Sequence, residues 1–522
     1  MSSISRLINK SVKIKNRMPE DTHFSGQRVS LLQWLILATL TLTSTLYAMS
    51  ITIANIALPQ LQGALAATQD QIAWTVTFNI VGTAIVTPMT GWLTTRFGQR
   101  HLMLTAVFGF AISSIMCGQA TTLTELVIYR VFQGAFGGPL VPLSQAIILG
   151  VFPRTLHSFA TAIWGMGVVC GPIIGPTVGG YISEAYSWRW VFYIIAPFSL
   201  LAFWGAWLYI RDTSRDDSAR LDWTGFISLS IALTALQLFL DRGNRLDWFE
   251  SNEVILEAAI AAIFFYIFTI HILTTKTPYL NPGLFKDRNY LLGALLVFLY
   301  GMLNFTPIVL YPSMLQELRG YPESIIGLLL AARGFGALAG NFLVLWISRN
   351  DPRVGLFIGF LAQAISCWIL ANFDINMTTY GVAWASALQG FGVGVTWVPL
   401  TVMMFSNIDP KYIPEGTAVL HLLRNIGSSI YISLTVTVVI RSTTQNYMDL
   451  SNFINPFNER FSFKDLIGFW ESETFSGLMG LSREIERQAA MIGYINAFYL
   501  LALTGFIALP LIFFVDNKKN RT

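Results

Sequence analysis

Residues 158–182 read SFATAIWGMGVVCGPIIGPTVGGYI, a run without charge that is long enough to cross a membrane as a helix. A helix that only faces lipid has no use for its six glycines and two prolines. Glycines let another helix approach closely, and prolines remove amide donors and bend the helix. We therefore predict a hinge or close-packing surface inside a helical bundle. It comprises Gly165, Gly167, Gly171, Pro172, Gly175, Gly179 and Gly180.

The composition of the chain is that of an integral membrane protein. Of its 522 residues, 54% are hydrophobic and 12% are charged, whereas soluble domains carry about 25% charged residues. Apolar windows of membrane-crossing length recur along the chain. We count fourteen, at residues 31–56, 72–92, 100–120, 125–150, 157–182, 189–210, 223–241, 252–274, 289–312, 324–347, 354–373, 379–405, 415–440 and 489–514. The predicted class is an all-α integral membrane protein with 14 transmembrane helices.

Two polar breaks, at residues 211–222 and 276–289, divide the spans into six, two and six. The predicted parts are a leader (1–30), an N-terminal six-helix half (31–210), two linker helices (211–288) and a C-terminal six-helix half (289–522) with a long outer loop (441–490). Within that loop, Leu481–Gln488 is amphipathic and is expected to run helically into the last span. Repeated six-span halves are how many secondary transporters frame a site that opens alternately to each side. A weak internal echo pairs Arg130 with Arg333, each downstream of a glutamate.

Basic residues set the expected orientation. The leader holds six of them, Arg6, Lys10, Lys13, Lys15, Arg17 and Arg28, which places it in the cytoplasm by the positive-inside rule. An even number of spans then puts both termini in the cytoplasm. The first apolar stretch is too long, and too far from the start, for a cleavable signal.

The sequence lacks the residues that several classes of function require. The three cysteines, Cys117, Cys170 and Cys367, all fall within predicted spans, and the five histidines are scattered, so no disulfide framework or metal site is expected. No Gly-x-x-x-x-Gly-Lys phosphate loop is present. A net charge of +4 is explained by the inner loops and does not suggest nucleic acid. We therefore expect a transporter and not an enzyme, with no catalytic residues.

Six motifs stand in order along the predicted spans. They are IANIALP (53–59), GWLTTRFGQR (91–100), RVFQG (130–134), the Gly-Pro run (171–180), WRWVF (188–192) and LRNIGSS (423–429). Together they resemble the fourteen-span drug/proton antiporter branch (EmrB/QacA type) of the major facilitator superfamily, over essentially the whole chain from residue 31. In that resemblance, the Gly-Pro run is the surface on which the two halves rock.

The resemblance implies a secondary exporter of small molecules in the bacterial inner membrane, driven by the proton gradient and without a cofactor. Multidrug efflux is the family default. The alternative is a dedicated exporter of an anionic or zwitterionic metabolite, such as a carboxylate siderophore; an importer of the same fold is disfavoured by the antiporter motif. Expected partners are the substrate, the lipid bilayer and, as for other such exporters, a periplasmic adaptor and an outer-membrane channel that would contact the long outer loop.

Two motifs contain candidate functional residues. In the loop after span two, Arg96 and Arg100 can bond carbonyls and acidic groups across neighbouring helices, while Gly91 and Gly98 allow a tight turn. We predict that these four residues form a cytoplasmic latch. The alternative is that the two arginines only follow the positive-inside bias. Arg130 lies within a span, where a charge usually faces the bundle interior with a partner, unless it snorkels to the interface. Its expected partner is Gln133, three residues on and on the same helical face.

Departures from the family pattern concern the proton. The first span of the family carries an acid where this chain has Ser50, near Asn55, and the signature-loop acid is replaced by Thr95. No Asp or Glu occupies the central part of any predicted span. The embedded ionisable residues are instead basic: Arg130, Arg333, His421 and Arg424, the last beside Asn425. They predict a cavity of positive potential, with His421 as a proton carrier because histidine titrates near neutral pH; alternatively, the arginines only bond carbonyls of broken helices.

Overall fold

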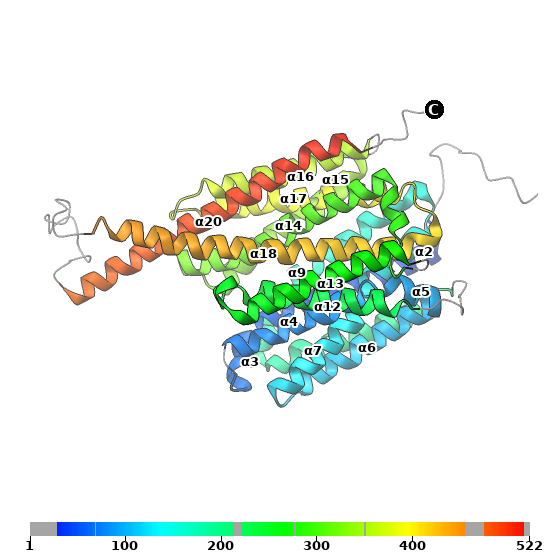
Figure 1. Cartoon of the computed structure of the whole chain (residues 1–522), viewed down its shortest axis with the longest axis horizontal. Helices are drawn as coiled ribbons and strands as arrows, with labels where there is room; N and C mark the ends of the chain where they lie inside the picture. The colour runs from blue at the N-terminus through cyan, green and yellow to red at the C-terminus, as the bar shows by residue number, and fades with distance from the viewer. Residues whose placement is uncertain are drawn as a thin grey trace, which may run out of the picture.

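The computed structural model describes residues 29–67, 69–212, 221–275, 278–348, 351–454 and 474–515, and within these ranges its regular elements are all helices (Figure 1). This confirms the all-α class. The first ten helices are α2 (Leu31–Ile56), α3 (Leu58–Ala64), α4 (Gln69–Val86), α5 (Thr90–Phe97), α6 (Gln99–Gln119), α7 (Leu123–Gly137), α8 (Leu140–Val151), α9 (His157–Ala185), α10 (Trp188–Tyr193) and α11 (Ile195–Tyr209). The others are α12 (Trp223–Arg242), α13 (Asn252–Thr274), α14 (Arg288–Arg319), α15 (Glu323–Ile347), α16 (Pro352–Ala371), α17 (Thr379–Met404), α18 (Ile413–Ser451) and α20 (Phe475–Phe513). Short 3-10 turns are η1 (Arg154–Leu156), η2 (Trp248–Glu250), η3 (Pro282–Lys286) and η4 (Pro410–Tyr412).

Membrane-crossing helices make up most of the described chain. Twelve of its helical segments are long and apolar enough to span a bilayer, and the pair α4–α5, bent by 54°, makes a thirteenth. Helix α9 has 29 residues, which is also a membrane-crossing length. The described helices are therefore consistent with the fourteen predicted spans.

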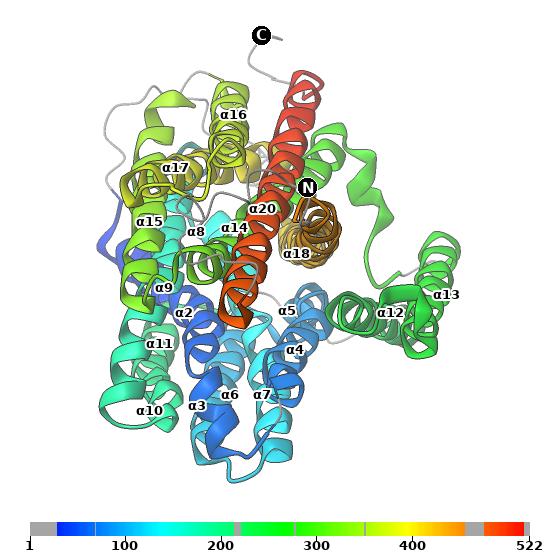
Figure 2. The same ribbon diagram turned by 90° about the vertical axis from the view of Figure 1, so that its left-hand side faces the viewer.

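The helices form two bundles and an outlying pair (Figure 2). We call α2–α11 the first half, in which α2 packs on α9 and α4 on α7, and α14–α20 the second half, in which α15 packs on α17 and α14 on α18. The linker helices α12 and α13 pack on each other and lie outside both bundles, where α12 contacts α4 and α18. We call the end of the molecule at which α2 begins and α20 ends the termini-bearing end, and the opposite end the hairpin end.

The glycines of α9 face its own half. A Cβ added to Gly171 would lie 2.6 Å from the carbonyl oxygen of Thr45 on α2, and one on Gly175 would lie 2.5 Å from the hydroxyl of Thr52. Successive glycines four residues apart share one helical face, so this whole face docks on α2. The surface therefore packs within the first half rather than between the halves, which differs from our expectation. Gly165 of α9 faces the second half instead, since a Cβ there would lie 3.2 Å from Oδ1 of Asn341 on α15.

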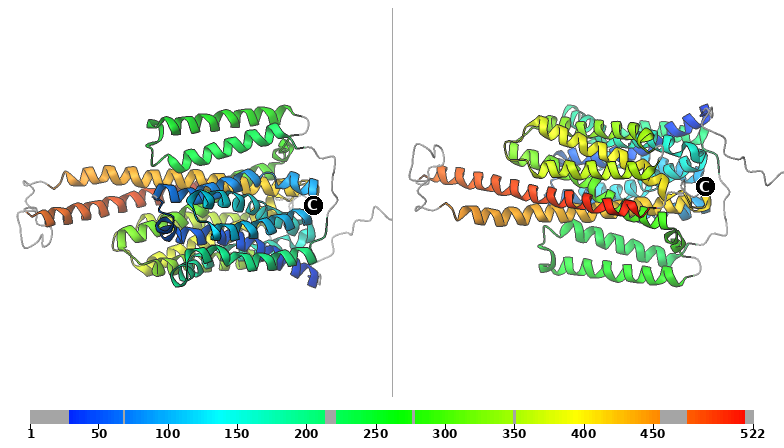
Figure 3. Two further views of the ribbon diagram at one scale, coloured as in Figure 1. Left: turned by 90° about the horizontal axis from the view of Figure 1, so that it is seen from below. Right: turned by 90° about the horizontal axis from the view of Figure 1, so that it is seen from above.

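Two helices extend beyond the bundle at the hairpin end. Figures 1 and 3 show α18 and α20 running past the other helices as a pair. Each has 39 residues, so both ends of the predicted outer loop are helical: α18 continues to Ser451, and α20 begins at Phe475. The predicted helical stretch Leu481–Gln488 is confirmed. The Tyr447 hydroxyl bonds that of Ser482 across the pair (2.9 Å); residues 455–473 of the predicted loop lie outside the described residues.

Candidate transport site

Arg130 is buried inside the first half and does not snorkel. Its side chain is 1% exposed, its Nε donates to the carbonyl of Thr75 (3.0 Å), and its Nη1 donates to Oε1 of Gln133 (2.5 Å). Gln133 in turn donates to the hydroxyl of Ser114 (2.8 Å). Asn79 donates to the backbone carbonyl of Arg130 (2.9 Å). The predicted pair Arg130–Gln133 thus joins α4, α6 and α7 through one polar network.

Arg333 occupies a similar network in the second half. Its Nη2 donates to the backbone carbonyl (2.6 Å) and to Oδ1 (2.7 Å) of Asn304, and its Nε donates to Oε1 of Gln389. Gln389 donates to the carbonyl of Leu303 (2.9 Å). Two of the donors of Arg333 are therefore engaged with neutral acceptors on α14 and α17, and this arginine ties the helices of its half together.

The two arginines are not repeats of each other. A Cβ on Gly134 of α7 would lie 2.1 Å from the carbonyl oxygen of Asn79, and one on Gly390 of α17 would lie 1.8 Å from the carbonyl oxygen of Arg333. The sequence Gln-Gly recurs at 133–134 and 389–390, so the position matching Arg333 in the first half is Asn79 on α4. Each half thus places a glutamine against an arginine, but the arginine comes from the opposite helix of the pair. The echo between the two arginines in the sequence therefore does not reflect equivalent positions.

His421 joins the two halves. It lies on α18, is 1% exposed, and its Nε2 is 2.6 Å from Oε1 of Gln145 on α8. The amide of Gln145 donates to the hydroxyl of Thr401 on α17 (3.3 Å). The imidazole lies beside Trp164 of the first half and Trp397 of the second, with ring centroids 6.5 and 5.7 Å away. Its Nδ1 has no hydrogen-bond partner among the described residues.

Arg424 lies one turn from His421, between aromatic rings. Its guanidinium carbon is 5.3 Å from the ring centre of Phe305 and 5.6 Å from that of Trp397. Nη2 donates to Oδ1 of Asn425 (3.2 Å), whereas Nε has no partner among the described residues. The described residues form no ion pair with it. A cation held by π faces and one amide keeps donors available to an anionic ligand.

At the two positions where the family carries acids, the hydroxyl groups of this chain form hydrogen bonds within their own helices. The hydroxyl of Ser50 is buried and donates to the carbonyl of Tyr47 (2.7 Å), and that of Thr95 donates to the carbonyl of Gly91 (3.1 Å). The side chain of Asn55 falls outside the part of the chain that the structure describes. In the described ranges, no group of three or more His, Cys, Asp or Glu could hold a metal ion.

Comparisons with known proteins decide the family. A profile of the Major Facilitator Superfamily matches residues 40–432. The chain belongs to the major facilitator superfamily. It is 32% identical over 482 residues to the multidrug export protein EmrB of Escherichia coli strain K12, covering 91% of this chain and 94% of that protein. It is also 32% identical over 414 residues to the fatty acid resistance protein FarB of Neisseria gonorrhoeae, covering 78% and 81%.

A solved structure of the proton:xylose symporter XylE shares the major facilitator fold, with a TM-score of 0.61 at 14% identity, covering 93% of this chain and 96% of that one. The sequence relatives place the chain in the EmrB-type drug/proton antiporter branch of the superfamily. It is therefore an efflux transporter embedded in a membrane.

This major facilitator chain is closed at its termini-bearing end. Helix α18 there contacts α5 and α8 of the first half, and α9 contacts α15 and α17 of the second. A Cβ on Gly91 would lie 2.9 Å from Cα of Glu415, which places the start of the signature loop directly on α18. Gly98 has φ 84°, a conformation that favours glycine, and Nη2 of Arg100 donates to the carbonyl of Trp207 on α11 (2.7 Å). The latch role of Arg96 and these residues stays a prediction.

Among the residues not predicted from the sequence are three polar ones near the contact between the halves: Gln145, Thr401 and Asn341. All are buried at 1% exposure or less and lie in helices α8, α17 and α15. Gln145 is a polar amide inside the apolar run LVPLSQAIIL, a placement that requires a hydrogen-bond partner. That pattern was a usable signal, although it does not reveal that the partner is on the other half.

Proposed function

We propose that this transporter is a proton-driven exporter of small molecules that works by alternating access, without a cofactor and without catalysing a reaction. Its membrane is the bacterial inner membrane, and both termini are cytoplasmic. In that orientation the contacts at the termini-bearing end close the cytoplasmic side, so the structure corresponds to an outward-facing state. The observation that supports this proposal most is the bond between His421 and Gln145, which crosses the two halves beside Arg424 and two tryptophans.

His421 is the proposed proton carrier. In its neutral form the proton lies on Nε2, because this atom donates to Oε1 of Gln145, and Nδ1 is then free to accept a second proton. A charged imidazole would lie one helical turn from the Arg424 guanidinium, in a region of low dielectric constant where like charges repel strongly. Protonation therefore destabilises the junction between the halves, whereas the neutral form stabilises it.

Replacement of His421 is expected to uncouple transport from the proton gradient. His421→Gln keeps a donor for Gln145 but cannot take up a proton, so uphill efflux should fall at least tenfold while downhill exchange of substrate continues. The measurement is substrate flux in proteoliposomes with and without an imposed pH gradient. His157→Gln is the matched control, since His157 bonds the nearby carbonyl of Phe152 (2.9 Å) within its own half. Unchanged uphill efflux by His421→Gln would exclude this residue as the carrier.

A second candidate function is export of molecules that carry a carboxylate, and Arg424 favours it. The relative FarB is named for fatty acid resistance, and a guanidinium between Phe305 and Trp397 suits an apolar acid, with the carboxylate on the cation and the apolar part against the rings.

Arg424→Gln is expected to lower transport of apolar acids selectively. Loss of one charge-assisted contact corresponds to about 1.5–3 kcal/mol, or roughly 10- to 100-fold in affinity, while neutral substrates should be affected less than about threefold. Competition binding of a fatty acid and of its methyl ester to the purified protein measures this difference. Equal losses for acid and ester would contradict a carboxylate site and would leave multidrug efflux as the function.

We also propose that the projecting pair α18–α20 contacts a periplasmic adaptor, which would link the exporter to an outer-membrane channel. The pair extends past the other helices at the end that faces the periplasm in the proposed orientation (Figure 3). Cross-linking from Ser482 on the outer part of the pair, in cells that express a candidate adaptor from a neighbouring gene, tests this contact.

A further inference from the structure

The segment that joins the linker helices to the second half is held by two carboxylates. Oδ2 of Asp222 accepts the backbone N–H of Tyr279 (3.1 Å), and Oε1 of Glu415 accepts the backbone N–H of Asn281. Tyr279 and Leu280 are 8% and 7% exposed. We call residues 279–281 the strap. Each of its two anchors belongs to a different structural unit, since Asp222 begins the linker and Glu415 lies in the first turn of α18.

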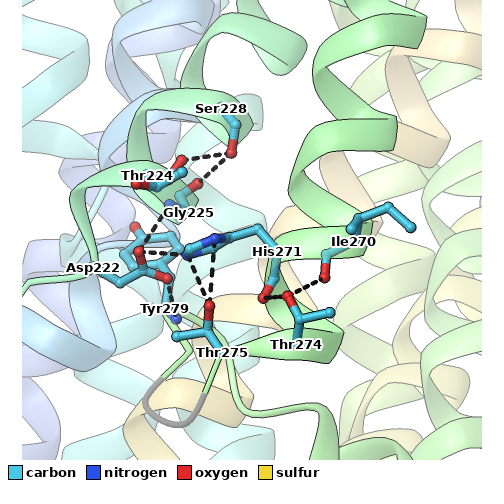
Figure 4. A network of polar contacts seen from close by, with 9 residues as sticks. All are labelled: Asp222, Thr224, Gly225, Ser228, Ile270, His271, Thr274, Thr275 and Tyr279. Carbon is cyan, nitrogen blue, oxygen red and sulfur yellow. Dashed lines mark hydrogen bonds and ion pairs between the residues drawn. The ribbon is translucent and has the colours of Figure 1, made fainter.

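The Asp222 anchor is fixed by several contacts (Figure 4). Its Oδ1 accepts the N–H of Gly225 (3.0 Å), which caps α12, and also contacts Nε2 of His271 near the end of α13 (2.8 Å). The hydroxyl of Thr275 contacts the same imidazole (3.3 Å). One carboxylate thus holds the start of α12, the end of α13 and the strap in a single arrangement.

The Glu415 anchor lies where the two halves touch. A Cβ on Gly91 of α5 would lie 2.9 Å from Cα and 3.1 Å from Cβ of Glu415. The next residue, Gly416, accepts at its carbonyl a hydrogen bond from the Tyr290 hydroxyl of α14 (3.1 Å). A carboxylate in the first turn of a helix is favoured by the helix dipole. The strap therefore ends on the part of the second half that must move away from α5 when the termini-bearing end opens.

Apolar packing joins the strap to both halves. The core around it contains Leu229, Leu233, Tyr279, Leu280, Val419 and Leu422, and Ala84 and Met89 of the first half pack against this core. At the opposite end of α12, the hydroxyl of Thr77 on α4 donates to Oδ2 of Asp241 (2.5 Å), and Thr437 of α18 donates to Oδ1 of Asn244 (2.7 Å). Helix α12 is thus bonded to the first half through Asp241 and to the second through the carbonyl of Leu240, which accepts from the hydroxyl of Ser433 (2.8 Å).

We propose that the strap holds the termini-bearing end shut, and that Glu415 is the positioning residue that fixes the strap to the second half. Rocking of the halves moves Glu415 away from Gly91, while Asp222 keeps the other end of the strap on the linker helices. Opening therefore requires loss of the Asn281–Glu415 bond or movement of the whole linker pair. The proposal gives the linker helices α12 and α13 a role in setting the balance between the inward-facing and outward-facing states. It rests on the proposed function.

The test measures how often the termini-bearing end opens. Ala162 of α9, which is fully buried against Val344, Val395 and Val398 of the second half, is replaced by cysteine in a Cys170→Ser background. A membrane-impermeant maleimide is added from the termini-bearing side, and the labelling rate reports opening. No substrate or proton gradient is needed, so failure of the His421 proposal in flux assays would not affect the result.

Glu415→Ala and Asp222→Ala each remove one hydrogen bond between a charged group and the strap, so each is expected to raise the labelling rate about tenfold. Asp222→Ala also removes the contacts to Gly225 and His271, for which the capping control below accounts. Glu415→Gln keeps an acceptor and should give a smaller increase. Both carboxylates hold the same strap, so their effects on labelling should not multiply. We expect the labelling rate of the double variant to be less than about threefold above that of the faster single variant.

The matched control is Asp351→Ala, which removes a helix-capping carboxylate from α16. It should leave labelling unchanged. Unchanged labelling in Asp222→Ala or in Glu415→Ala, in protein with the wild-type melting temperature, would overturn the proposal; so would multiplicative effects in the double variant. Equal increases in Asp351→Ala would show general loosening and would overturn it as well.

Discussion

Replacement of Arg130 by leucine is expected to abolish efflux, to below roughly 1% of wild type. The change removes one donor from the Thr75 carbonyl and leaves Gln133 Oε1 with a weak contact to Sγ of Cys117 (4.0 Å) in a buried site, and a buried acceptor that loses its donor is unfavourable by about 1–3 kcal/mol. It also removes one of the side-chain bonds between α4 and α7. Efflux of a fluorescent substrate from cells, normalised to the amount of protein in the membrane, measures the loss.

Arg130→Lys separates the charge from the geometry. A lysine keeps the charge but lacks the planar fork that lets Arg130 donate to Thr75 and Gln133 from separate nitrogens, so we expect it to restore folding more than transport. The control is Arg154→Leu, which removes an exposed arginine from η1 and should leave efflux near wild type. Full activity in Arg130→Leu would show that the network is dispensable.

Alanine at Gly134 or at Gly390 is expected to destabilise the protein strongly and to a similar extent. In each half the added Cβ would lie about 2 Å from a backbone carbonyl oxygen of the facing helix. Because this oxygen belongs to the helix backbone, the clash is relieved only if one helix shifts as a whole. Overpacking of this kind costs about 1–3 kcal/mol per site. Thermal unfolding of the purified protein in detergent, followed by tryptophan fluorescence, should show a lower melting temperature for both variants.

Gly327→Ala is the matched control for this pair. Gly327 lies on α15, the helix that faces Gly390, and a Cβ there would meet nothing within 4 Å. Its substitution should leave the melting temperature unchanged or raise it slightly, because alanine favours a helix more than glycine does. A large difference between Gly134→Ala and Gly390→Ala would contradict the equivalence of the two helix pairs.

Sequence patterns located the membrane-crossing helices closely. The predicted spans 223–241 and 252–274 agree with α12 and α13 to within one residue, because lipid requires about 20 apolar residues in a helix and polar residues mark its ends. The same signal missed the outer part of α18 and the first residues of α20, whereas the amphipathic pattern at Leu481–Gln488 predicted helix in α20 correctly. Beyond residue 440 the sequence becomes polar, so the apolar window that marks a membrane span ends there. The helices α18 and α20 nevertheless continue, because they pack on each other outside the apolar region.

The local part of the site was predictable and the long-range part was not. Arg130 and Gln133 are three residues apart on one helix, so their contact follows from helical geometry. The partner of His421 is 276 residues away in the sequence, and nothing in either segment specifies it. Likewise, the spacing of Gly167 and Gly171 shows that they share a face, but only the fold shows that α2 covers it.

The position of α12 and α13 makes the exporter unequal on its two lipid-facing flanks. On one flank these helices lie against α4 of one half and α18 of the other; the contact between α9 and α15 lies across the bundle from them (Figure 2). A molecule dissolved in the bilayer therefore encounters linker side chains on the first flank. On the second it meets α15, whose aromatic side chains Phe335 and Phe342 are exposed.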